Sequence, residues 1–227
     1  SDSLLASISS ASSYLSKDSR FILKQYTPGS VVTSSFGGAS SEQSRVLWDG
    51  IDISSMASGV FDLSLVPASM LNNTALYDGI NGGALAPMGS VGALNVAAEI
   101  PKGRGTSTLF SASSIGDRGL FAQSWGNIGT VRYQSSLRST GGTNSYPYTL
   151  GSLNGVLEGN GYNDLTYLQS FQGKLSRWNW ESTLWYTQSE KDNSGSILTP
   201  GYINHLEDDM LRFKYAIRNR TNQWQVY

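Results

Sequence analysis

Residues 41–53 read SEQSRVLWDGIDI, in which an apolar run ends at Asp49-Gly50 and a second apolar run follows at once. Asp-Gly is a tight-turn dipeptide, because Gly accepts positive φ and Asp can support the turn with its side chain. The stretch therefore predicts a hairpin or a sharp strand end. Gly- and Ser-rich segments flank it, FGGASS (36–41) before it and SSMASGVFDLSL (54–65) after it.

The composition differs from that of an average globular domain. Charged residues make up 15% of the 227 residues and aromatic residues 11%, whereas an average domain is about 25% charged. The net charge of −1 gives no reason to expect nucleic acid as a partner. The absence of Cys excludes disulfides, thiol catalysis and zinc–thiolate sites. A weakly charged chain rich in Gly and aromatic residues favours a transmembrane β-barrel, although many secreted β proteins share this composition.

The first half, residues 1–102, predicts a small α+β unit with much irregular backbone. Leu4–Leu15 has apolar residues at helical spacing, so we expect a short helix that ends before Arg20. Strand candidates separated by Gly-rich loops follow: FILKQY (21–26), VVTSSF (31–36), SRVLWDGIDI (44–53) and ALNVAAEI (93–100). Pro101-Lys102-Gly103 is a plausible hinge to the second half.

From about residue 104 the pattern changes to an alternation of apolar and polar residues. Four runs show it: 131–138, 165–172, 178–187 and 211–218. Each is about 10 residues long with aromatic residues near its ends, which is the length a tilted strand needs to cross a bilayer. We expect Phe213 and Tyr215 to face lipid, and Arg212 and Lys214 to face the lumen, where Lys214→Gln would cost little stability. Trp178, Trp180 and Trp185 are interpreted as a membrane-interface girdle.

The predicted connections alternate in length. Short turns are expected at Gly126-Asn127, at Ser176-Arg177 and at 219–222, and long polar segments at 139–163 and 189–208. In an up-and-down chain the short turns then lie on one side and the long loops on the other, as in outer-membrane barrels. A soluble antiparallel sheet with one solvent-exposed face gives the same alternation of apolar and polar residues. The loop lengths and the aromatic strand ends favour the membrane.

The first half resembles the plug domain of TonB-dependent outer-membrane receptors. Three segments carry the resemblance, in the family's order: FGGASSEQSRVLWDGIDI (36–53), DLSLVP (62–67) and NTALYDGINGGALAPMGSVGALNV (73–96). The second half is similar, more loosely, to the opening strands of the cobalamin-transporter subgroup through LWYTQSEKDNSGSIL (184–198). Two positions depart from the family pattern, because Phe36 and Tyr77-Asp78-Gly79 stand where basic residues are usual.

The resemblance implies an α+β plug domain at 1–102 followed by antiparallel transmembrane β-barrel strands at 103–227. Plugged barrels have about 22 strands, and residues 104–227 supply roughly seven, so we expect a partial barrel. The implied location is the outer membrane of a Gram-negative bacterium, with lipid around the strands and the plug facing the periplasm. A TonB box is not visible upstream of Leu4, so TonB coupling is not visible in this chain.

The leading functional hypothesis is uptake of a bulky scarce nutrient, such as a corrinoid. The resemblance places its binding at the plug's apical loops, at Ser55, Met56 and Ala57 and around Asn81 to Leu85. Packing of these loops against the barrel wall explains them equally well. The alternative is a receptor-derived plug that seals or gates a larger outer-membrane pore, such as the translocon of type nine secretion. The departures from the family pattern motivate it.

The sequence contains no recognisable catalytic motif. It has no Gly-x-Ser-x-Gly, no phosphate-binding loop and no His-Glu-x-x-His, so we expect neither an enzyme nor a cofactor. The single His, His205, is interpreted as a solvated loop residue. Asp192 and 207–209 offer clustered oxygen ligands of the kind calcium prefers. A solvated acidic loop is the favoured interpretation, and no metal site is predicted.

Overall fold

The computed structural model describes residues 21–25, 29–55, 58–71, 73–78, 90–194, 203–219 and 225–226. The chain divides into two compact units, residues 1–99 and 100–227. Each unit has sheets of its own, and each is treated separately below. The described part is mostly β-sheet, and its strand pairs are antiparallel with one exception. No helix in it is both long and apolar enough to span a membrane.

The first unit is built on a small mixed sheet. Its strand order is β4-β3-β6-β5, with β3 and β6 parallel and the other neighbours antiparallel. The bounds are β3 (Ser44–Trp48), β4 (Ile51–Asp52), β5 (Thr74–Asp78) and β6 (Gly92–Val96), and a separate pair is formed by β1 (Phe21–Lys24) and β2 (Thr33–Phe36). The described helical turns are η1 (Ser41–Gln43), η2 (Leu63–Leu65) and α3 (Ala68–Leu71). The expected helix at 4–15 lies outside the described residues, so the α+β character stays a prediction.

The Asp49-Gly50 turn has the predicted hairpin conformation. Both residues have positive φ, 49° and 86°, as a two-residue turn between twisted antiparallel strands requires. The turn joins β3 to β4, with Trp48 opposite Ile51. A neighbouring strand also supports it, because the Gly50 N–H donates to Asn95 Oδ1 at 2.8 Å.

Phe36 occupies a packing position in the first unit. Its side chain is buried together with the apolar residues of β3 and β6. The ring lies so close to Gly92 that a Cβ added there would be 2.6 Å from it. The Phe36 N–H donates to Ser44 Oγ at 2.9 Å. Phe36, which stands where the family usually has Arg, therefore fits an apolar environment.

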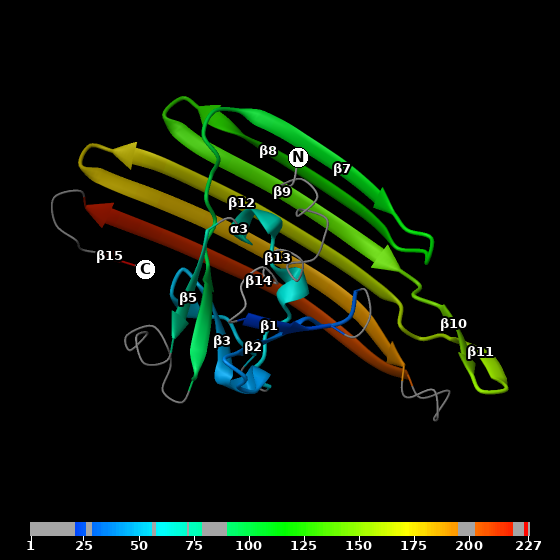
Figure 1. Ribbon diagram of the computed structural model, residues 1–227. Helices are drawn as coiled ribbons and strands as arrows, with labels where there is room; N and C mark the ends of the chain where they lie inside the picture. Colours follow the sequence, from blue (N-terminus) through cyan, green and yellow to red (C-terminus); the bar gives the residue numbers. More distant parts are fainter. Residues whose placement is uncertain are drawn as a thin grey trace. The chain divides into compact units, whose positions relative to one another are not determined.

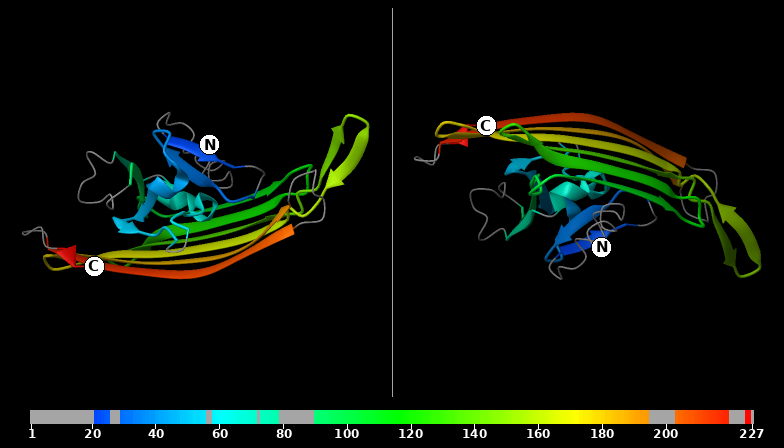
Figure 2. Two further views of the ribbon diagram at one scale, coloured as in Figure 1. Left: turned by 90° about the horizontal axis from the view of Figure 1, so that it is seen from below. Right: turned by 90° about the horizontal axis from the view of Figure 1, so that it is seen from above.

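The second unit is a seven-stranded antiparallel sheet in the order β15-β14-β13-β12-β9-β8-β7 (Figure 1). The strands are β7 (Gly105–Ala112), β8 (Arg118–Ile128), β9 (Val131–Gly142), β12 (Tyr162–Leu175), β13 (Trp178–Ser194), β14 (Ile203–Asn219) and β15 (Gln225–Val226). A separate hairpin, β10 (Tyr146–Leu150) and β11 (Leu153–Leu157), extends beyond the ends of the long strands (Figure 2). Neighbours in sequence thus pair in space, apart from this insertion.

Three of the predicted connections are wrong. The long segment expected at 139–163 contains the end of β9, the β10-β11 hairpin and the start of β12. Strand β8 continues through Gly126-Asn127, and the turn falls at Gly129-Thr130, where Gly129 has a φ of 61°. Gly126 instead lies under an aromatic ring, since a Cβ added there would be 3.3 Å from the Tyr133 ring. The expected loop at 189–208 is largely strand, because β13 runs to Ser194 and β14 starts at Ile203. Polar residues paired across these strands resemble a loop in sequence.

Candidate functional site

Only one of the five predicted plug-loop residues lies in the described part of the chain. Met56, Ala57, Asn81 and Leu85 lie outside it. Ser55 is exposed and closes its own loop: its N–H donates to the Val60 carbonyl at 3.0 Å, and its carbonyl accepts from the Gly59 N–H at 2.7 Å. These contacts give Ser55 a structural role, and its part in ligand binding stays a prediction.

The seven-stranded sheet has two chemically distinct faces. The strand register places directly opposed residues on the same face, so each face can be followed across the sheet. The aromatic face comprises Phe110, Leu120, Tyr133, Leu137, Leu165, Tyr167, Phe171, Trp178, Trp180, Leu184, Tyr186, Leu211, Phe213 and Tyr215. The polar face comprises Gln134, Ser136, Arg138, Thr140, Asp164, Thr166, Ser170, Thr183, Thr187, Ser189, Lys191, Arg212 and Lys214.

Phe213 and Tyr215 lie on the aromatic face and are 65% and 46% exposed, whereas Lys214 on the polar face is buried. The predicted sidedness of these strands is therefore confirmed. The girdle prediction was partly wrong, because Trp185 has the opposite parity from Trp178 and Trp180. Its ring lies on the polar face, is fully buried, and has the Arg212 guanidinium 4.8 Å from its centroid.

A buried ion pair joins two strands on the polar face. Lys191 Nζ of β13 lies 3.7 Å from Asp164 Oδ2 of β12, and both side chains are only 3% exposed. The Ser189 hydroxyl donates to the other carboxylate oxygen, Asp164 Oδ1, at 2.6 Å. Sequence analysis missed this pair. The sequence places a charged residue at a polar position of each strand, Asp164 and Lys191. It does not give the strand register, which is needed to pair them.

A second charged group lies near the short turns, on the polar face. Glu181 Oε1 accepts from Lys214 Nζ at 2.9 Å and from Arg218 Nη2 at 3.1 Å. This corrects the expectation that Lys214→Gln is nearly neutral. The Lys214 ammonium is buried against a carboxylate, and its removal takes one of two cations from Glu181.

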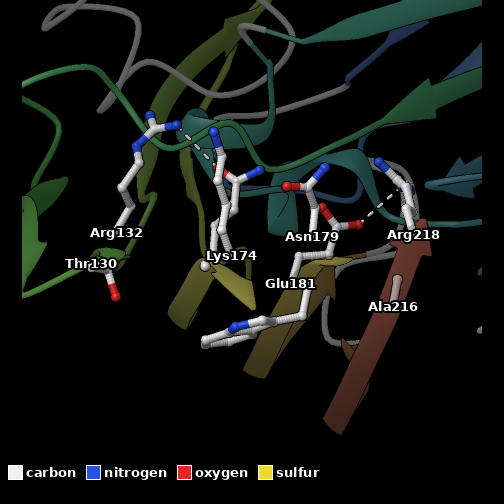
Figure 3. Close-up of a pocket in the computed structure, with 10 residues that line it drawn as sticks. Thr130, Arg132, Lys174, Asn179, Glu181, Ala216 and Arg218 are labelled. Carbon is white, nitrogen blue, oxygen red and sulfur yellow. Dashed lines mark hydrogen bonds and ion pairs between the residues drawn. The ribbon is translucent and has the colours of Figure 1, made fainter. Parts of the chain in front are cut away.

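A cavity of about 580 Å³ lies beside this charged group (Figure 3). The residues that line it come from β12, β13, β14 and the start of β9. Arg132, Lys174, Asn179 and Arg218 extend from neighbouring strands to the same side, with their nitrogen atoms gathered there (Figure 3). Among the described residues of the lining, cations outnumber carboxylates by three to one, with Glu181 as the single acid. The cavity therefore favours an anion over a cation.

Arg132 also fixes the segment that enters the second unit. Its Nη2 donates to the carbonyl of Ile100 and, at 3.3 Å, to that of Pro101. Its Nη1 donates to Gln172 Oε1 at 3.1 Å. All three acceptors are neutral, so these contacts use the donors of Arg132 without neutralising its charge.

The acidic segment interpreted as a solvated loop lies on two strands. Asp192 and residues 207–209 lie on β13 and β14, and Asp192 Oδ1 is 2.8 Å from His205 Nδ1. The hydrogen bond to Asp192 raises the pKa of His205. His205 therefore lies on a strand and has a partner, which corrects its assignment to a loop, while its side chain is 59% exposed, as a solvated residue is. Among the described residues, no group of three or more His, Cys, Asp or Glu is arranged to hold a metal ion.

Comparison with known proteins supports the fold. No family model and no curated protein matches the sequence. Among solved structures, the copper transporter OprC matches with a TM-score of 0.65 and 14% identity, over 93% of this chain and 32% of that one. The siderophore receptor PirA from Acinetobacter baumannii matches with a TM-score of 0.49 and 13% identity, over 92% of this chain and 43% of that one, which is too weak to carry an argument.

The similarity to OprC shows the fold alone at this level of identity. The chain is a mostly antiparallel β structure whose fold matches part of the OprC structure, and it spans 32% of the OprC chain. OprC is named as a transporter of copper and not of cobalamin, so the predicted cobalamin-like subgroup has no support from it.

Proposed function

We propose that this chain serves outer-membrane transport, with residues 1–102 as a plug and residues 103–227 as the opening strands of a large barrel. The observation that carries the proposal is the seven-stranded meander with an aromatic face opposite a polar face. In an outer-membrane barrel, residues that face lipid alternate with residues that face the lumen. The fold similarity to OprC supports the same assignment.

The exposure of the aromatic face favours lipid as its surroundings. Phe110, Leu211 and Phe213 are 74%, 66% and 65% exposed, and all three lie on this face. Contiguous apolar surface is rare on soluble monomers beyond a few hundred Å² and marks a protein or membrane contact. In hydrocarbon these side chains need no protein cover, and the buried polar face is then the wall of the lumen.

The experiment compares two Arg substitutions on one face of β14. We expect the chain to fractionate with outer membranes, and Phe213→Arg to impair assembly at a cost of about 2–4 kcal/mol, because it places a charge near mid-membrane. Ile203→Arg is the matched control. Ile203 is also exposed and lies on the same face of the sheet as Phe213. It is at the outer end of β14, where the cost of placing an Arg falls to about 0–1 kcal/mol. A folded, monomeric chain that is stable in water without detergent would refute the membrane assignment.

The ligand is proposed to be a bulky nutrient of the corrinoid kind, bound on the outer side of the plug. Its contacts would come from Ser55, Met56, Ala57 and residues around Asn81 to Leu85. Equilibrium binding of cobalamin, haem and a ferric siderophore to outer-membrane fractions tests this. Absence of binding by all three would count against import. Recovery of the chain with a larger foreign barrel in a detergent pull-down would favour a plug that gates another pore.

A further inference from the structure

The cavity near the short turns of the second unit has more positive charge than its own acid can balance. The part of its lining that the structure describes includes Arg132, Lys174 and Arg218, and Glu181 is the only carboxylate in that part. Glu181 Oε1 already accepts from Arg218 and from the buried Lys214. Two cations on one carboxylate leave Lys174 and Arg132 without a counter-charge in the lining.

Two donors at this cavity lack an acceptor within the described part of the chain. Lys174 is exposed, and no hydrogen bond or ion pair to a described residue satisfies its ammonium. Arg218 Nε is buried and has no hydrogen-bond partner there. A buried guanidinium N–H without an acceptor is costly, and hydrogen bonds to charged groups are the strong ones.

The cavity is also shaped to hold a small solute. Its volume of about 580 Å³ falls within the usual range for ligand sites, about 300–1,000 Å³. Amide side chains, Gln172 and Asn179, stand among the cations and add neutral donors. Gly173 and Trp180 also border the cavity, with the Trp180 ring on the opposite, aromatic face of the sheet.

We propose that this cavity binds the oxyanion group of a small solute, a phosphate or a carboxylate, between Lys174 and Arg218. Lys174 supplies a point charge, and the Arg218 guanidinium, whose side chain is 43% exposed, supplies directed N–H groups. Glu181 holds the Arg218 guanidinium in place through its Nη2 contact. The site belongs to the second unit alone, so it does not depend on the proposed transport function.

The test titrates the folded chain with inorganic phosphate and, separately, with succinate, at about 150 mM NaCl to screen unspecific attraction. We expect saturable heat with at least one of the two probes in isothermal calorimetry. Lys174→Met should weaken binding by about tenfold or more, since a hydrogen bond to a charged group contributes about 1.5–3 kcal/mol. The probe that binds more tightly identifies the oxyanion class.

Two controls separate a built site from general positive charge. Lys24→Met makes the same change at an exposed strand position in the first unit and should leave binding unchanged. Arg218→Met should weaken binding as Lys174→Met does, and the double variant should abolish it. No saturable binding of either probe, or equal binding by the parent, Lys174→Met and Lys24→Met chains, would overturn the proposal.

Discussion

Lys191→Met should strongly destabilise the second unit, because it removes the cation that lies 3.7 Å from the buried Asp164 carboxylate. The two charges are 3.7 Å apart and both side chains are 3% exposed. At an effective dielectric constant of about 20, such a pair attracts by roughly 4–5 kcal/mol. Breaking a buried pair from one side costs about 3–5 kcal/mol. The hydroxyl of Ser189 still donates to Asp164 at 2.6 Å, so we expect the lower part of that range.

The assay is equilibrium urea unfolding in detergent micelles, followed by Trp fluorescence with Trp185 as a buried reporter on the same face of β13. The paired replacement Asp164→Leu with Lys191→Met removes both charges. It should recover most of the loss, because exchanging a whole buried pair for apolar residues is often close to neutral. Lys24→Met is the exposed control. A loss below about 1 kcal/mol for Lys191→Met, the scale of surface pairs, would refute the reasoning.

Three further predictions test other parts of the fold. Gly50→Ala should destabilise the first unit by about 1–3 kcal/mol in thermal melts, because a φ of 86° strains any residue with a Cβ. An unchanged melting temperature would contradict the turn assignment. Gly173→Val should displace the Trp180 ring, which would lie 2.6 Å from the new Cβ, at about 1–3 kcal/mol, seen as altered Trp fluorescence. The hydrogen bond to Asp192 raises the pKa of His205 above its ordinary value of 6.5. The contribution of this pair to the free energy of unfolding is therefore fully present below pH 6.5 and is lost as the pH rises through the raised pKa. Amide protection factors at the outer end of β13 and β14, corrected for the intrinsic pH dependence of exchange, should therefore be higher at low pH, and Asp192→Asn should remove that difference.

Local chemistry and alternation could be predicted from the sequence. The Asp49-Gly50 turn followed from two residues whose φ angles few others adopt. The sidedness of β14 followed from the period of two, which places Phe213 and Lys214 on opposite faces whatever the register. The parity of Trp185 was available from the same rule, and the girdle assignment overlooked it.

Contacts across strands could not be predicted in this way. The Lys191–Asp164 pair and the cavity beside Glu181 depend on which residues the register brings opposite one another. The limits of β13 and β14 were wrong for a related reason: polar residues at strand ends look like loop residues until their partners, such as Asp192 for His205, are known. The apical plug loops depend on residues outside the described part of the chain, except for Ser55.

The central claim is that the aromatic face of the sheet contacts hydrocarbon, and bilayer quenching tests it most directly. The chain has no Cys, so Phe213→Cys, Met210→Cys and Ile203→Cys each give one labelling site on β14. With a fluorophore at each site and bromine on the lipid chains, we predict strong quenching at 213. Quenching should be weak at 210, on the polar face, and at 203, at the outer strand end. Equal quenching at 213 and 210, or none at 213, would contradict the account.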